Sequence, residues 1–234
     1  MGALVVIPTY NEVENIRGLV EAVLRIPDVS MMIVDDGSPD GTGALADALA
    51  LEHRGRVQVL HRTGARGFGR SYVEGMQRAL RLADIDVVCQ MDADLSHLPT
   101  DLPRLIAAAR DADLVIGSRY VHGGQVENWP WRRLVLSGFA NEYVRMLTRI
   151  PVRDITSGFR CWRRQMLIDI PLAELRSDGY AFQVEMTWHA HRLNRRIAEV
   201  PITFVERRQG QSKLSTRVMA ESAALPWRLL FRQP

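Results

Sequence analysis

The sequence predicts an α/β fold, in which an open, mostly parallel sheet carries helices on both faces. In the first half of the chain, short apolar runs alternate with amphipathic segments, a pattern typical of such a fold. The runs are almost continuously apolar, as expected of strands that are covered on both faces. No linker rich in Ser, Gly or Pro divides the 234 residues, so we expect one core domain with a C-terminal helix.

Five strands are predicted in the first half, at residues 3–7, 31–35, 56–60, 86–91 and 113–117. Between them, apolar residues recur at helical spacing from Val13 to Val23 and again from Leu102 to Ala109. Pro99 is typical of a helix start, and Gly41 and Thr42 begin another helix after a turn. Strands and helices therefore alternate over the first half.

The second half is less regular. We expect helices at residues 134–150 and 181–194, and strands at residues 159–162 and 197–205. Pro201 places the last strand near an edge or an end of the sheet, because proline cannot donate to a strand ladder. A polar, glycine-containing loop is expected at residues 207–215, followed by an amphipathic helix at 216–234 that Pro226 interrupts.

Composition limits the possible environments. The formal charge is only +3, yet an excess of Arg over Lys suits phosphates, anionic lipid or nucleic acid without choosing among them. Cys89 and Cys161 are expected to be buried free thiols, which indicates a reducing cytoplasm. The sequence shows neither a signal peptide nor an apolar run of roughly 18 residues, so we expect any membrane contact to be peripheral or through a partner.

An acidic turn follows the fourth predicted strand. Asp92 and Asp94 lie two residues apart and can both reach one divalent cation. Oxygen ligands favour Mg²⁺ or Mn²⁺, whose coordination is often completed by substrate phosphates and water. The alternative is a turn that only caps the next helix, and His97 is interpreted as a hydrogen-bonded turn residue.

Two further turns carry polar groups at strand ends. Residues 35–42 contain acids that can accept hydrogen bonds from a base or ribose, although an ordinary Asx-turn would look the same. Residues 7–12 offer the aromatic ring of Tyr10 and the carboxylate of Glu12. Because parallel strands end at the same edge of a sheet, we expect the three turns to form one site.

These motifs support a resemblance to a known family. Residues 8–12, 35–42 and 92–97 resemble the inverting family 2 glycosyltransferases of the GT-A fold, which is Rossmann-like. More particular segments resemble the dolichol-phosphate, or polyprenol-monophosphate, mannose synthases; they are residues 117–120, 154–160, 179–186, 200–202 and 207–214. The resemblance covers nearly the whole chain in order.

The resemblance implies an activity and a site. It implies metal-dependent transfer of mannose, with inversion, from GDP-mannose to a polyprenyl (dolichyl-type) monophosphate. Mg²⁺ or Mn²⁺ would be held by Asp92 and Asp94, with Ser96 as a weak or water-mediated ligand. Donor-binding residues would be Pro8, Tyr10, Glu12, Val34, Asp36, Asp92, Ala93, Asp94, Arg119, Arg207 and Lys213. The acceptor phosphate would be bound by Arg119, Arg133, Ser137 and Arg207, and the catalytic residues would be Asp94, Arg119 and Arg133.

Such a reaction places particular demands on the site. A phosphate acceptor is already ionised at pH 7, so no general base is needed, but cations must bring two anions together. The loop 207–214 could close over the donor. Asp154, Gln183 and Glu185 could orient sugar hydroxyls or tie the second half together. Arg66 is left unassigned because related proteins often carry Lys in this glycine-rich segment.

The resemblance also implies a division of the chain. Residues 1–215 form the glycosyltransferase domain, with a nucleotide- and metal-binding half at 1–118 and an acceptor half at 119–215. Residues 129–133 mix Trp with Arg, as segments at membrane interfaces do. We expect a cytoplasmic protein held peripherally on the cytoplasmic face of a membrane, with or without a separate anchor protein. Residues 216–234 could lie on the bilayer or pack against the domain.

Three alternatives differ from this prediction. Another polyprenyl-phosphate glycosyltransferase would use a UDP-glucose or aminosugar donor. A nucleotide-binding dehydrogenase lacks support, because no Gly-x-Gly-x-x-Gly follows the first strand. A non-catalytic nucleotide- or nucleic-acid-binding module would leave the acidic turns unexplained, since carboxylates repel phosphates. We therefore expect no nucleic-acid partner.

Overall fold

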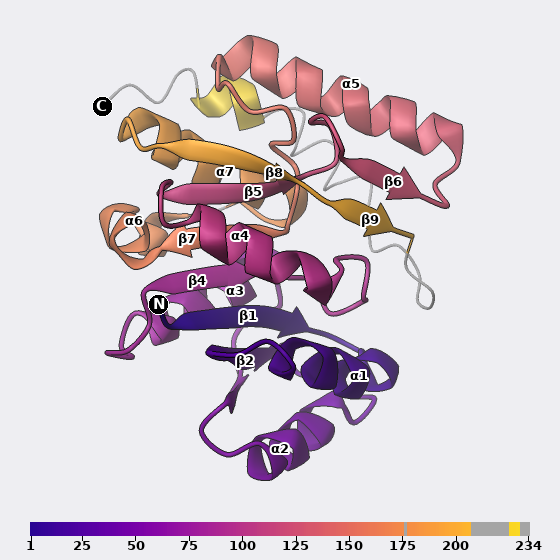
Figure 1. Ribbon diagram of the computed structural model, residues 1–234, viewed down its shortest axis with the longest axis vertical. Coiled ribbons are helices and arrows are strands. Elements are labelled where there is room, and N and C mark those ends of the chain that lie inside the picture. Colours follow the sequence, from indigo (N-terminus) through magenta and orange to yellow (C-terminus); the bar gives the residue numbers. More distant parts are fainter. Residues whose placement is uncertain (176, 207–224, 230–234) are drawn as a thin grey trace.

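The computed structural model describes residues 1–175, 177–206 and 225–229 (Figure 1). A seven-stranded sheet has the order β3-β2-β1-β4-β7-β5-β8, and β6 pairs with β9 in a second, two-stranded sheet. The strands are β1 (Ala3–Thr9), β2 (Val29–Asp35), β3 (Val57–His61), β4 (Val87–Gln90), β5 (Leu114–Ser118), β6 (Gln125–Glu127), β7 (Arg160–Arg163), β8 (Ile197–Pro201) and β9 (Thr203–Val205).

Helices connect most of these strands. They are α1 (Val13–Leu24), α2 (Thr42–Glu52), α3 (Phe68–Ala79), α4 (Leu102–Ala108), α5 (Trp131–Thr148), α6 (Arg164–Asp169) and α7 (Gly179–Arg192), with short 3₁₀ turns η1 (Pro99–Asp101) and η2 (Leu172–Glu174). Within the described residues, no helix combines the length and the apolar character needed to cross a bilayer.

The sheet is mostly parallel, as predicted. β1 runs parallel to both β2 and β4, whereas β7 is antiparallel to its neighbours β4 and β5. The chain moves outward from β1 to β3 and returns through α3 to β4, on the other side of β1. Ligands of open α/β sheets bind at such a reversal, beyond the carboxyl ends of the strands.

Helices cover both faces of the sheet, which also confirms the prediction (Figure 1). On one face, α1, α2 and α4 contribute to a buried cluster that includes Ile16, Leu49 and Leu105. On the other face, α3, α6 and α7 contribute to a second cluster that includes Met76 and Phe182. Burial on both faces explains why the parallel strands are continuously apolar.

Some elements differ from the sequence-based expectation. Helix α3 was not predicted, because its glycines weaken a helical pattern. The structure explains them: a Cβ at Gly75 would lie 2.5 Å from Val6 Cγ1, and one at Gly69 would lie 2.6 Å from the Ser177 carbonyl oxygen. The single strand expected at 197–205 is in fact β8 and β9, which separate at Ile202 and join different sheets. Pro201 ends β8 at the sheet edge, as expected.

The two cysteines lie in the core of the sheet. Cys89 and Cys161 are free and fully buried, as expected, and face each other across β4 and β7 with their Sγ atoms 2.8 Å apart.

In the tail, residues 225–229 are helical, and Leu225 and Leu229 belong to the second core cluster. Trp227 Nε1 donates to Tyr143 Oη at 2.8 Å. This part of the tail therefore packs against the domain, and the rest of 216–234 lies outside the described residues.

Candidate active site at the carboxyl ends of the strands

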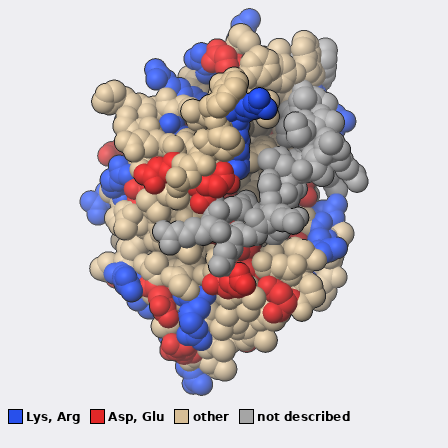
Figure 2. Space-filling model, turned by 90° about the vertical axis from the view of Figure 1, so that its right-hand side faces the viewer, with Lys and Arg blue, Asp and Glu red and all other residues tan. Residues whose placement is uncertain are grey.

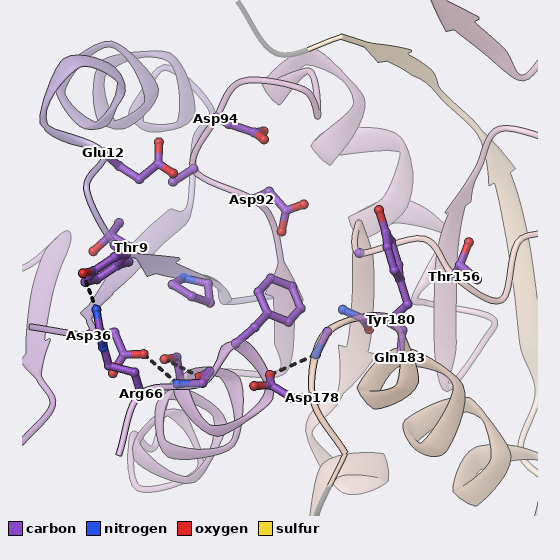
Figure 3. Close-up of a pocket in the computed structure, with 18 of the residues that line it drawn as sticks. Thr9, Glu12, Asp36, Arg66, Asp92, Asp94, Thr156, Asp178, Tyr180 and Gln183 are labelled. Atoms are coloured by element: carbon purple, nitrogen blue, oxygen red, sulfur yellow. Dashed lines mark hydrogen bonds between the residues drawn. The ribbon is translucent and has the colours of Figure 1, made fainter. Parts of the chain in front are cut away.

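A cavity of about 750 Å³ opens at the carboxyl ends of the central strands (Figure 3). Thr9, Glu12, Asp36 and Arg66 lie on one side of it, Thr156, Tyr180 and Gln183 lie on the other, and Asp92 lies between them. The three turns singled out in the sequence therefore meet in one site, together with a wall from the second half. Its lining also includes Pro8, Tyr10, Gly67, Phe68, Ser71, Ala93, Asp94, Arg133, Gly158, Asp178 and Gly179.

The acidic turn is fixed by contacts close in the sequence. Asp94 Oδ1 accepts from the Ser96 amide at 3.1 Å and from Ser96 Oγ at 2.6 Å. Leu95 has a φ of 61°, the left-handed backbone that reverses the chain here. Tyr72, on α3, donates from its Oη to Asp92 Oδ1 at 3.4 Å. The turn thus presents both carboxylates and Ala93 to the cavity.

His97 acts as the hydrogen-bonded turn residue that the sequence suggested. Its Nδ1 accepts from the Asp92 amide at 3.2 Å, and its ring stacks on Phe159 at 4.9 Å. Burial lowers the pKa of His97 to about 4, against the opposing attraction of Asp94. The imidazole is therefore neutral at pH 7, which leaves Nδ1 free to accept that hydrogen bond.

The donor atoms of the turn fit a hard divalent cation. Asp92, Asp94 and the Ser96 hydroxyl offer oxygen alone, the chemistry that Mg²⁺ and Mn²⁺ prefer. Among the described residues there is no cluster of three or more His, Cys, Asp or Glu side chains arranged for a metal. Two carboxylates suffice where substrate phosphates and water complete the coordination. Ser96 is buried behind Asp94 and lines only a smaller adjoining cavity.

The side of the cavity that the first half of the chain forms, here called the first-half wall, includes Tyr10, Asp36 and Arg66. It combines an acid and an aromatic ring. Asp36 accepts a hydrogen bond from Arg62 and another from the Gly67 amide at 2.9 Å. Arg66, left unassigned from the sequence, hydrogen-bonds the Tyr10 hydroxyl and lies 4.7 Å from the centre of its ring. These groups form a polar and aromatic surface suited to a nucleotide.

Three of the residues predicted to bind the donor or the acceptor phosphate do not line this main cavity. The side chain of Val34 is fully buried in the core, and Ser137 lies on α5 outside the lining of both cavities. Arg119 borders only the smaller cavity, of about 50 Å³. Arg207 and Lys213, with the predicted loop 207–214, lie outside the described residues.

Arg119 is held in a buried ion pair. Its Nε and Nη2 donate to the two carboxylate oxygens of Asp154, both at 2.7 Å, and Nη2 also reaches Thr156 Oγ1 at 3.0 Å. Burial opposes the charge on Arg119, but Asp154 outweighs it and raises the pKa of the guanidinium. Asp154 is fully buried, so it ties the second half together and does not reach the cavity.

Arg133 lines both cavities and is more accessible. Its Nη1 donates to both carboxylate oxygens of Glu206 at 2.6 Å, and the side chains of this pair are each 29% exposed. The guanidinium also lies 4.0 Å from the centre of the Trp129 ring. Of the arginines predicted for the acceptor phosphate, Arg133 is the described one that faces the main cavity.

Sequence reasoning missed two residues that shape the site. Buried Arg62 holds Asp36 and also contacts Ser71 and Glu74. Asp178 Oδ1 accepts from the Gly69 amide at 2.6 Å and from the Gly179 amide at 2.9 Å, which joins the starts of α3 and α7. An Asp before a predicted helix is a signal for such a cap, whereas no local pattern marks Arg62.

Charges of both signs gather on the face where the strands end (Figure 2). Acidic side chains lie chiefly around the middle of this face, with Lys and Arg side chains near them and toward its edges. Such a surface suits anionic substrates only where a cation or arginine offsets the carboxylates.

The comparisons define the class of the protein. Residues 4–170 match Glycosyl transferase family 2, and the chain belongs to this family. It is 52% identical over 214 residues to the polyprenol monophosphomannose synthase of Mycolicibacterium smegmatis, covering 91% of this chain and 80% of that protein. It is also 47% identical over 224 residues to the undecaprenyl-phosphate mannosyltransferase of Micrococcus luteus, covering 95% of this chain and 91% of that protein.

A solved structure supports the fold. Glucosyl-3-phosphoglycerate synthase from Mycobacterium tuberculosis, in complex with Mn²⁺, UDP-glucose and phosphoglyceric acid, matches with a TM-score of 0.70. The match covers 97% of this chain and 80% of that one, at 19% sequence identity. The predicted α/β architecture of the GT-A type is therefore confirmed.

Proposed function

We propose that this chain transfers mannose from GDP-mannose to a polyprenyl monophosphate, with inversion and with the aid of Mg²⁺ or Mn²⁺. The observation that carries the proposal is that the Asp92–Asp94 turn and Arg133 line one cavity. The names of the two relatives, a polyprenol monophosphomannose synthase and an undecaprenyl-phosphate mannosyltransferase, support the sugar and the acceptor.

The nucleotide would lie against the first-half wall. Tyr10 and Arg66 offer a ring and a cation, and Asp36 offers a carboxylate that is already oriented by Arg62. Asp92 and Asp94, backed by Ser96, would hold the metal ion beside the diphosphate. When bound, that ion supplies neutralisation of the charge that develops on the leaving diphosphate.

The acceptor phosphate would approach from the side of Arg133. It needs no general base because it is ionised at pH 7, but its charge must be offset. Arg133 can do this with a bidentate contact once it leaves Glu206, while Arg119, held by Asp154, adds positive potential behind the site. Arg207 and Lys213 remain part of the proposed set. An oxygen of the acceptor phosphate attacks the anomeric carbon of the sugar from the side opposite the leaving diphosphate. The bond to the diphosphate breaks as the new bond forms, which inverts the anomeric configuration.

The lipid part of the acceptor would stay in a membrane. On α5, large apolar side chains face solvent, including Trp131 at 70% and Phe139 at 67% exposure, next to Arg132. Such a mixture suits a bilayer interface. We propose that the chain lies at the cytoplasmic face of a membrane, with or without a separate anchor protein. In this proposal, residues 119–215 serve the acceptor and residues 1–118 serve the nucleotide.

A transfer assay tests the proposal. Purified protein is incubated with polyprenyl phosphate, Mg²⁺ or Mn²⁺, and either GDP-mannose or UDP-glucose, and the anomeric configuration of the product is read by NMR. The expected product is β-linked polyprenyl-phosphate mannose, formed from GDP-mannose in preference to UDP-glucose. A preference for UDP-glucose would show that GDP-mannose is not the donor. An α-linked product would overturn the inverting mechanism.

A further inference from the structure

The side chain of Gln183 is buried beside the cavity without a partner. Gln183 is 1% exposed, and neither Oε1 nor Nε2 makes a hydrogen bond. Of the unpaired buried polar side chains in the described part of the chain, it is the one that lines the main cavity. Native proteins pair nearly all such groups, because burial removes their hydration. A partner from outside the protein would complete it.

The position of Gln183 on α7 is firmly fixed. Its backbone carbonyl accepts from Arg160 Nη1 at 2.9 Å and from Thr187 Oγ1 at 2.8 Å. Arg160 is itself fully buried and is held by two further carbonyls, those of Ile155 and Ser157. The protein therefore anchors the backbone here with a buried cation while it leaves the side-chain amide unpaired. Such an amide is pre-organised for a ligand.

The amide lies where the sugar of a bound donor would be. Gln183 and Tyr180 are on the side of the cavity opposite Asp36, with Asp92 between the two sides (Figure 3). A Cβ at Gly158, which also lines the cavity, would lie 3.5 Å from both carboxylate oxygens of Asp92, so glycine leaves the space beside that carboxylate unfilled. A nucleotide on the first-half wall, with its diphosphate at Asp92, would direct its sugar toward Gln183.

The chemistry of the amide distinguishes a sugar from a phosphate. A carboxamide donates through Nε2 and accepts at Oε1, and neighbouring sugar hydroxyls can both accept and donate. A fully ionised phosphate only accepts hydrogen bonds, so it would leave Oε1 unpaired. We propose that Gln183 recognises the sugar of the nucleotide donor, donating to one hydroxyl and accepting from another. This inference rests on the proposed function for the identity of the donor.

The test compares binding of a nucleotide with and without its sugar. Isothermal titration calorimetry with Mg²⁺ measures the Kd of GDP and of GDP-mannose for the wild type, Gln183→Met and the exposed control Gln165→Met. We expect Gln183→Met to keep its affinity for GDP but to weaken GDP-mannose binding about tenfold, because two hydrogen bonds are lost. Its Tm should stay equal or rise, since replacing unpaired polar atoms by apolar ones of similar shape is nearly neutral or stabilising. Gln165→Met should change neither quantity.

Other outcomes separate this inference from the proposed function. Equal weakening of GDP and GDP-mannose, or a lower Tm for Gln183→Met, would mean that Gln183 is structural and would overturn the inference. The same titrations with UDP and UDP-glucose test a different donor. If Gln183→Met weakens the binding of UDP-glucose alone, Gln183 recognises the donor sugar, but that sugar is glucose and not mannose. If the wild type transfers mannose and Gln183→Met binds GDP-mannose normally, the inference fails and the proposed function stands. If the wild type binds no sugar nucleotide, the inference also fails.

Discussion

The acidic turn and the arginines of the site are held in different ways. In the acidic turn, Asp94 accepts from Ser96, two residues further along, directly after a strand. The two arginines of the site are instead paired with distant residues: Arg119, which borders the smaller cavity, with Asp154, 35 residues away, and Arg133, which lines both cavities, with Glu206, 73 residues away. The central sheet thus forms the acidic turn locally, whereas the arginines are held by pairs between distant segments. Removing a charge should therefore lower chiefly the activity at the acidic turn and chiefly the stability at the buried arginine pair.

The largest effect should come from the buried pair of Arg119 and Asp154. Asp154→Ala leaves Arg119 charged, buried and unpaired, so we expect the free energy of unfolding to fall by about 3–5 kcal/mol. Urea denaturation followed by circular dichroism measures this change. Glu142→Ala, which breaks the exposed pair with Arg145, is the control and should leave the stability nearly unchanged. Wild-type stability of Asp154→Ala would contradict the proposed difference between the acidic turn and the arginine pairs.

In the acidic turn, a substitution should affect rate and spare the fold. Asp94→Ala removes a carboxylate that would hold the metal, so we expect kcat to fall about 100- to 1,000-fold, or about 3–4 kcal/mol in the barrier. The Tm should fall by only a few degrees, because the loss is confined to the two hydrogen bonds from Ser96 within one turn and leaves no buried charge without a partner. Asp111→Ala, at an exposed position, serves as control. Near-normal turnover at saturating Mg²⁺ or Mn²⁺ would reject the role of Asp94.

Asp36, on the first-half wall, is also held by a distant partner, because Arg62 lies 26 residues away in the chain. Arg62→Met leaves Asp36 without its cation, so we expect a loss of about 1.5–3 kcal/mol in the free energy of unfolding. The KM for GDP-mannose should also rise, since Asp36 would be less well oriented. Steady-state kinetics at fixed acceptor measures this. A lower stability with unchanged KM would show that Asp36 does not serve the donor.

The smallest effect is expected at the more exposed pair. In the proposed site, Glu206 would compete with the acceptor phosphate for Arg133, so Glu206→Gln should lower the KM for polyprenyl phosphate about two- to fivefold. The change in the free energy of unfolding should be less than about 1 kcal/mol. Arg133→Gln is the matched variant and should raise the same KM. If both substitutions raised it, the ion pair itself would be needed for acceptor binding.

The same contrast explains what could be predicted from the sequence. The sheet, its helices and the three polar turns follow from local patterns, because each turn directly follows an apolar strand. The Arg119–Asp154 and Arg62–Asp36 pairs could not be predicted, since nothing near either residue in the chain marks its partner. Helix α3 was missed because Gly69 and Gly75 serve close packing, which only the folded structure reveals. The unpaired amide of Gln183 is likewise visible only once its neighbours are in place.

In the proposed reaction, Asp92 and Asp94 bind a divalent cation that allows an anionic donor and an anionic acceptor to come together. The direct measurement is the initial rate of transfer from GDP-mannose to polyprenyl phosphate in excess chelator, followed by titration with Mg²⁺ or Mn²⁺. We predict that the wild type loses activity with chelator and regains it with metal, whereas Asp94→Ala does not recover. Transfer at an undiminished rate in excess chelator would show that Asp92 and Asp94 do not bind a metal ion needed for the reaction.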